Sequence, residues 1–131
     1  MVSDPVGDFI VRIKNASAVG KDVVSAPHSK LRFAIAEALE KKGYLKAVHK
    51  KVKKAQKTIE VTLRYDKHDK PVIHNIKRMS RPGRRLYYRV HDIHPVKYGK
   101  GSLILSTPEG IVADDEARKK KIGGEALFMI W

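Results

Sequence analysis

The chain has 131 residues, of which 42% are hydrophobic and 32% charged, and its formal net charge is +14. This composition fits one small folded protein, or two small subdomains, and excludes a disordered tail. Because it contains no cysteine and no apolar run near the roughly 20 residues of a membrane helix, disulfides, thiolate chemistry, cysteine-based zinc sites and membrane spans are excluded.

The positive charge is concentrated in the middle of the chain. Residues 51–100 carry 15 Lys and Arg against 4 Asp and Glu, whereas residues 101–131 carry 4 against 5. A segment this basic favours binding to the phosphate backbone of a nucleic acid, because binding releases the counterions of the phosphates. We therefore expect a nucleic-acid partner. The N-terminal residues do not resemble a signal peptide and no basic amphipathic helix is evident, so we expect a soluble, cytoplasmic protein without a membrane partner.

Two helices are predicted in the first half of the chain. The first, over residues 5–15, starts with the cap Asp4 and the first-turn Pro5 and continues with apolar residues at helical spacing. The second begins after the cap Ser29 and ends at Gly43, which suits a helix C-terminus.

Strands are predicted between and after these helices, over residues 22–26, 44–48, 58–65 and 72–79. Residues 49–57 are expected to form a basic connection between two of them. The fold class is therefore α+β, with an N-terminal unit of order α-β-α-β-β(-β) in which two helices cover one sheet face.

The sequence Ser80-Arg81-Pro82-Gly83 interrupts this pattern. We expect an N-terminal α+β subdomain over residues 1–79 and a smaller, mostly β subdomain with one short helix over residues 80–131. The strands of the second subdomain are expected at residues 84–90, 102–106, 110–113 and 123–131. A loop or short helix is expected at 91–99, and a short helix at 114–121, where acids precede bases as the helix dipole favours.

Catalytic and metal-binding patterns are weak. The six histidines are scattered, and His91-x-x-His94 with Asp92 lacks the further ligands of a metal site. Ser106 is not in a G-x-S-x-G context, and complete phosphate-loop or dinucleotide fingerprints are missing. We expect no enzyme activity, no metal site and no cofactor.

Basic residues interleaved with aromatic residues are the main candidate binding feature. Arginine holds phosphates bidentately and tyrosine can stack on an unpaired base, so this cluster predicts RNA contact. It comprises Arg78, Arg81, Arg84, Arg85 and Arg89 with Tyr87 and Tyr88. Strand alternation allows one of the two tyrosines to face RNA and places the other in the core. Five lysines between residues 50 and 57 could form a phosphate-tracking arm or a merely solvated hairpin.

The turn over Ser106, Thr107, Pro108, Glu109 and Gly110 offers hydroxyl groups instead of cations. Phosphate contacts position a protein on a nucleic acid, whereas directional hydrogen bonds specify where it binds. Because a hydroxyl both donates and accepts, we interpret this turn as a reader of base edges or ribose hydroxyls. Ordinary hairpin chemistry is the alternative.

Four segments together are similar to one known family. They are residues 4–16, 29–44, 72–87 and 104–125, with the blocks S-R-P-G-x-R-x-Y and S-T-x-x-G…A-R…G-G-E. In order and over essentially the whole chain they resemble the ribosomal protein S8 family. The resemblance implies two subdomains, primary binding to a central-domain stem of small-subunit ribosomal RNA early in assembly, and neighbouring ribosomal proteins as partners. In some bacteria members also repress their own operon mRNA.

The resemblance also implies RNA-binding positions, namely Ser106, Thr107, Tyr87, Gly124, Glu125, Lys30 and Arg84. Arg12 and Lys14, on the polar side of the first predicted helix, join Arg78, Arg81 and Arg85 as expected phosphate contacts. The family commonly reads S-T-S-K-G in the turn and G-L-G-I before the strand, where this chain has Pro108-Glu109 and Lys100-Gly101-Ser102. Pro108 removes a backbone donor and Glu109 weakens the attraction for phosphate.

Two other classes are compatible with the charge. A general nucleic-acid chaperone or DNA-binding module would bind by charge alone, although helix-turn-helix and zinc-finger patterns are missing. A translational repressor would apply the same chemistry to another RNA.

Overall fold

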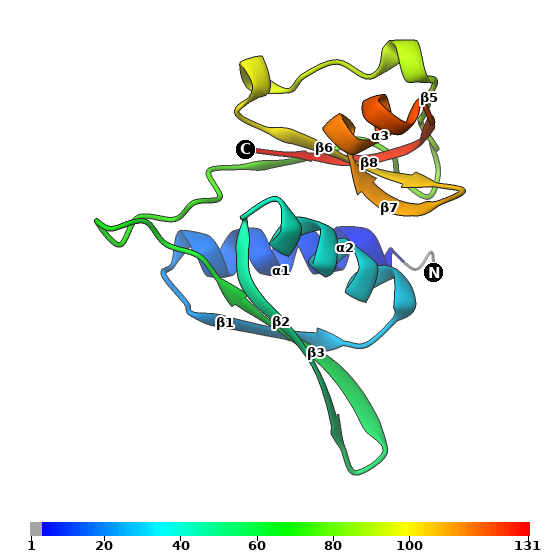
Figure 1. Ribbon diagram of the computed structural model, residues 1–131. Coiled ribbons are helices and arrows are strands. Elements are labelled where there is room, and N and C mark those ends of the chain that lie inside the picture. The colour runs from blue at the N-terminus through cyan, green and yellow to red at the C-terminus, as the bar shows by residue number, and fades with distance from the viewer. Residues whose placement is uncertain (1–3) are drawn as a thin grey trace. The chain divides into compact units, whose positions relative to one another are not determined.

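The computed structural model describes residues 4–131 and has an α+β fold (Figure 1). The described chain forms three α-helices and two antiparallel sheets, as the fold-class prediction required. It divides into two compact units. We call residues 8–73 the N-terminal unit, and residues 4–7 with 74–131 the C-terminal unit.

The N-terminal unit is a three-stranded sheet with its two helices on one face (Figure 1). Its elements are α1 (Pro5–Ala18, which starts in the other unit), β1 (Val23–Pro27), α2 (Lys30–Lys41), β2 (Leu45–Lys53) and β3 (Gln56–Leu63). The sheet order is β1-β3-β2. Ile59, Val61 and Leu63 alternate along β3 and are buried, because one face of the central strand lies in the core.

Both predicted helix starts are confirmed by their caps. The Asp4 carboxylate accepts a hydrogen bond from the Gly7 N–H at 3.1 Å, and the Ser29 hydroxyl accepts one from the Arg32 N–H at 3.1 Å. Gly43, with a φ of +86°, follows the end of α2, where a left-handed residue is easily supplied by glycine.

The basic segment 49–57, expected as a connection between two strands, forms the end of a hairpin in which most of its residues belong to the strands themselves. Strand β2 continues to Lys53, and β3 begins at Gln56. A tight turn joins them at Lys54 and Ala55, whose φ angles are +50° and +66°. Two successive positive φ values are typical of the hairpin turn whose twist matches that of the strands. Lysine is a poor strand former, but the hydrogen-bonded register with β3 determines the conformation here.

The C-terminal unit is built around strand β8 (Gly124–Ile130). Strands β4 (Ile76–Arg78) and β5 (Tyr87–Tyr88) pair with it on one side, and β6 (Ser102–Thr107) pairs with it on the other. Strand β7 (Gly110–Ala113) pairs with the outer side of β6, and α3 (Asp114–Lys120) follows it. Two short 3₁₀ turns, at 90–92 and 97–99, occupy the segment predicted as a loop or short helix.

One apolar cluster is the core of this unit. It contains Ile93, Val96, Leu103, Leu105, Val112, Ala117 and Ala126. Leu105 pairs with Ala126 whereas Ile104 pairs with Phe128, so Leu127 is the extra residue of a bulge in β8. The bulge reverses the alternation of the strand, and therefore Ala126 and Phe128 project from opposite faces.

Two strand predictions need correction. The strand expected at 72–79 covers only Ile76–Arg78, and it joins the sheet of the C-terminal unit through β8. The strand expected at 84–90 covers only Tyr87–Tyr88. The compact units accordingly divide at 73/74, six residues before the expected boundary at 79/80. The extents of β4 and β5 are determined by their pairing with β8, which is distant in sequence and which no local pattern contains.

Candidate nucleic-acid interface

Three side chains of the C-terminal unit form one row across its sheet. Tyr87 of β5 pairs with Glu125 of β8, and Glu125 pairs with Ser106 of β6. Directly opposed residues of antiparallel strands project to the same face, so the phenol ring, the carboxylate and the hydroxyl share a face over about 10 Å. Tyr87 is 68% exposed, whereas Tyr88 packs against the apolar cluster. The alternation predicted for the two tyrosines is confirmed.

Glu125, at the centre of the row, is held by two side chains. The Ser80 hydroxyl donates a hydrogen bond to Oε2 of Glu125, and Nη1 of Arg85 lies 3.0 Å from the same oxygen. The Ser80 hydroxyl also accepts a hydrogen bond from the Leu86 N–H at 3.2 Å. Ser80 is fully buried, and the Glu125 side chain is 16% exposed. The carboxylate is therefore fixed in place, and Oε1 makes no hydrogen bond to any residue from 4 to 131.

Ser80 is a member of this site that the sequence reasoning missed. Its segment was interpreted as a boundary between subdomains and as part of a family motif, and the serine itself was given no role. A buried hydroxyl that loses its hydrogen-bond partners costs free energy. The buried Ser80 hydroxyl therefore holds the Glu125 carboxylate more firmly than an exposed serine hydroxyl would. No local pattern could have identified it, because its partner Glu125 lies 45 positions away in the sequence.

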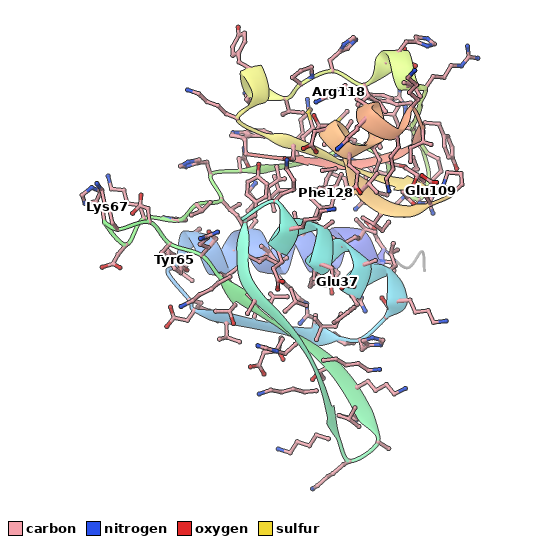
Figure 2. The ribbon with its side chains drawn as sticks, in the orientation of Figure 1. Glu37, Tyr65, Lys67, Glu109, Arg118 and Phe128 are labelled. Atoms are coloured by element: carbon pink, nitrogen blue, oxygen red, sulfur yellow. The ribbon has the colours of Figure 1, made fainter. Side chains whose placement is uncertain are left out.

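The two hydroxyls of the predicted reading turn have different roles. The Thr107 hydroxyl donates to the Gly110 carbonyl at 2.7 Å and accepts from the Glu109 N–H at 3.2 Å. It therefore closes the turn whose tip carries Glu109 (Figure 2). The Ser106 hydroxyl makes no hydrogen bond within residues 4–131. Ser106 is thus the hydroxyl that remains able both to donate to and to accept from a bound molecule.

Gly124 is required where β8 passes β6. A Cβ atom added at Gly124 would lie 2.2 Å from the Ser106 carbonyl oxygen and 2.9 Å from its carbonyl carbon. At the preceding position, Gly123, a Cβ atom would lie 2.4 Å from the Tyr88 carbonyl oxygen. These glycines allow the three strands that carry the row to approach one another. Their role is steric, since neither has a positive φ.

Arg78 differs from the other predicted arginines because its donors are engaged inside the protein. Its Nη1 and Nη2 donate to the two carboxylate oxygens of Asp4 at 2.9 and 2.8 Å, and its Nε donates to the Ser80 carbonyl. The hydrogen bond from Arg78 lowers the pKa of Asp4 below its ordinary value of 3.8. The Arg78 side chain is 13% exposed, so most of its hydrogen-bonding capacity is used inside the unit and little of it faces solvent.

The remaining predicted cations are exposed. Arg81 and Arg84 exchange backbone hydrogen bonds around the Pro82-Gly83 turn, and their side chains make no ion pair with residues 4–131. Lys30 and Lys14 are exposed on helices of the N-terminal unit. Arg12, on the same helix as Lys14, pairs with Asp8 at 3.0 Å and donates to the Ser25 carbonyl at 3.2 Å.

Other chemistries have little support in the described part of the chain. Within residues 4–131, no three His, Asp or Glu side chains gather as a metal site requires. Nε2 of His91 lies 3.6 Å from Oδ1 of its neighbour Asp92. None of the helices described is long and apolar enough to cross a membrane.

Comparison with known proteins finds one family. The sequence model described as "Ribosomal protein S8" matches residues 4–131. The chain is 43% identical over 131 residues to the small ribosomal subunit protein uS8 of Lactococcus lactis subsp. lactis, and 40% identical over 131 residues to that of Enterococcus faecalis. Each match covers 100% of this chain and 99% of the relative. The uS8 protein of Hyphomonas neptunium is 42% identical over 130 residues, which are 99% of this chain and 98% of that protein.

Proposed function

The chain belongs to the ribosomal protein S8 family, and on that premise we propose that it is a structural constituent of the small ribosomal subunit that binds a central-domain stem of 16S ribosomal RNA early in assembly. Proteins of this family are ribosomal components and not enzymes. The proposal places the chain in the ribosome, in the cytoplasm, beside other small-subunit proteins.

The row of Tyr87, Glu125 and Ser106 is the observation that carries the proposal. It puts a ring that can stack, a fixed acceptor and an uncommitted hydroxyl on one face of a sheet. RNA stems are read through ribose hydroxyls, through base edges in the shallow minor groove and through bases displaced from the stack. An ammonium group only donates and mostly finds phosphate, whereas this row both donates and accepts.

The cations have a separate task in this proposal. Exposed Arg81, Arg84 and Lys30 attract the phosphate backbone and set the register, and the row then selects the stem. An mRNA stem with the same irregular groove would satisfy the same surface. Repression of the protein's own operon is therefore the same binding reaction on a second RNA.

The test is the affinity for the central-domain stem against a random RNA duplex of equal length, measured across a salt series. Ser106→Ala removes the uncommitted hydroxyl, and we expect the affinity for the stem to fall roughly five- to tenfold, as for one lost hydrogen bond of about 1 kcal/mol. Affinity for the random duplex should not change. Thr107→Ser keeps the hydroxyl that closes the turn and is the matched control.

A preference for the stem that persists at high salt and falls in Ser106→Ala supports the proposal. Equal binding of wild type to both RNAs, steeply lost with salt, would show a basic protein that reads no particular stem. That outcome would overturn the proposal.

A further inference from the structure

The end of the β2–β3 hairpin carries a dense set of lysines that the row does not use. We call residues 49–57 the basic arm. Every residue of the basic arm is exposed, and its lysines are Lys50, Lys51, Lys53, Lys54 and Lys57. The sequence has no Asp or Glu between Leu45 and Ile59. In Figure 1 this hairpin extends beyond the rest of its sheet.

Most of these charges have no partner inside the protein. Lys51 pairs with Glu60 at 3.0 Å. The other four lysines of the basic arm make no ion pair with residues 4–131. Like charges on paired strands repel one another, so this arrangement destabilises the hairpin unless an external anion neutralises it.

The hydrogen-bonded register displays the strand lysines on both faces of a two-stranded ribbon. Lys50 opposes Ile59 and Val52 opposes Lys57, so Lys50 and Lys57 share a face. Lys51 and Lys53 alternate to the other face. Lys51 and Lys53, which are successive positions on that face, are therefore about 6.8 Å apart along the strand. The positive φ angles of Lys54 and Ala55 close the hairpin in a tight turn.

The basic arm is continuous with a predicted RNA-binding position. The His28 N–H donates to the Lys57 carbonyl at 3.0 Å, and Ser29 and Lys30 follow at the start of α2. Desolvation, and then the charges of Lys50 and Lys57, lower the pKa of His28. Positive charge therefore runs from the basic arm to the N-terminal end of α2, within one compact unit.

We propose that the basic arm is a second RNA-binding surface, which contacts the phosphates of an RNA helix without regard to sequence. The inference rests on the proposed function for its choice of polyanion. Lysine presents a point charge that suits phosphate contact. The basic arm has no Phe, Tyr or Trp for base stacking, and Val52, 63% exposed, is its one large exposed hydrophobic side chain, which does not suit membrane insertion.

The experiment compares two variants that each lose two positive charges. Lys53→Gln/Lys57→Gln neutralises part of the basic arm, and Lys67→Gln/Lys70→Gln neutralises two exposed lysines of another turn of the same unit (Lys67 is labelled in Figure 2). Binding of fluorescein-labelled random RNA duplex and of the central-domain stem is measured by anisotropy between about 50 and 300 mM salt. Thermal unfolding of each variant verifies its fold.

The variant of the basic arm should bind both RNAs roughly tenfold more weakly at low salt, with a salt slope shallower by about two. The ratio of stem to random affinity should not change, because phosphate contacts carry no sequence information. The control variant should keep the wild-type slope.

Equal slopes in the two variants would overturn the proposal. Binding to phosphatidylserine vesicles that the arm substitutions abolish, with RNA binding intact, would assign the basic arm to membranes and would also overturn it. If the wild-type protein shows no preference for the stem, the proposed function is refuted instead. The difference between the salt slopes of the two variants still tests the role of the basic arm.

Discussion

Asp4 and Arg78 are joined by two parallel hydrogen bonds, at 2.8 and 2.9 Å, across 74 positions of sequence. The same carboxylate caps α1 through the Gly7 N–H. A Cβ atom added at Gly7 would lie 2.4 Å from Oδ2 of Asp4 and 2.5 Å from Nη1 of Arg78. One carboxylate thus accepts hydrogen bonds from a backbone N–H at the start of α1 and from Arg78. Arg78 is an arginine that sequence reasoning assigned to RNA contact.

Replacing Asp4 separates these two roles. Asp4→Asn keeps a good cap and loses the charge, whereas Asp4→Ala loses both, so we expect Asp4→Ala to cost about 1 kcal/mol more in unfolding free energy. Since the pKa of Asp4 is lowered in the folded state, its ionic contribution is present above the ordinary value of 3.8 and is lost as pH falls through the lower folded value. Urea unfolding should show a wild-type advantage over Asp4→Asn that is constant above about pH 5 and shrinks below about pH 4. An advantage independent of pH would contradict this account.

Gly124→Ala tests the close approach of β8 to β6. The added methyl group would overlap the Ser106 backbone, so we expect a loss of about 2 kcal/mol or more in unfolding free energy, together with weaker RNA binding. Gly83→Ala is the control, because a Cβ atom there has no heavy atom within 4 Å and its φ is not positive. Similar stabilities for the two variants would exclude the steric role.

Ser80→Ala should loosen Glu125 while leaving every side chain of the row present. The change leaves the part-buried Leu86 N–H without a partner and leaves Oε2 of Glu125 with Arg85 alone, and we expect a cost of about 2 kcal/mol in urea unfolding. Arg85→Gln removes a half-exposed ion pair from the same carboxylate and should cost less than about 1 kcal/mol. If both substitutions cost the same, the buried hydroxyl does not position Glu125.

Tyr87 is predicted to contribute to RNA affinity through its ring. Tyr87→Phe keeps the stacking surface and should bind the stem within about twofold of wild type, whereas Tyr87→Ala should lose about 1–3 kcal/mol of binding free energy. Stability should not change in either variant, because the side chain is mostly exposed. Equal losses in Phe and Ala variants would assign the contact to the hydroxyl group instead.

His28 provides a measurement of the field of the basic arm. Lys50→Gln/Lys57→Gln should raise the pKa of His28 toward its ordinary value of 6.5, but incompletely, since desolvation is the larger cause of its depression. Because the folded pKa is below the unfolded one, His28 disfavours folding slightly as pH falls through that range, and the variant should lessen this effect. Titration of the imidazole signals by NMR tests both statements, and an unchanged pKa would place the lysines farther from His28.

Local pattern was sufficient for the helices and for most of the C-terminal strands. Asp4-Pro5 and Ser29 marked helix starts, and Gly43 marked an end, because caps depend on neighbours within one turn. The alternation that separates Tyr87 from Tyr88 is equally local. The family was also evident from sequence, since its motifs extend over most of the chain.

Local sequence patterns could not predict which distant segments pair with one another. The β2 strand continues through Lys50, Lys51 and Lys53 because β3 returns beside it, and β4 belongs to the C-terminal unit because β8 supplies its hydrogen bonds. In the same way, sequence treated Ser106 and Thr107 as equivalent hydroxyls and Arg78 as one of several free cations.

Sequence by itself therefore determined the fold class, the family and the basic character of this protein, because propensity, charge and motif are properties of short segments. The tertiary structure alone decided which polar groups remain available. It engages Arg78 with Asp4 and the Thr107 hydroxyl with its own turn, and it leaves the Ser106 hydroxyl uncommitted beside Glu125. The physical reason is that a hydrogen-bonding group satisfied inside the protein has little left to offer a ligand, and its partner can be brought to it from any distance along the chain.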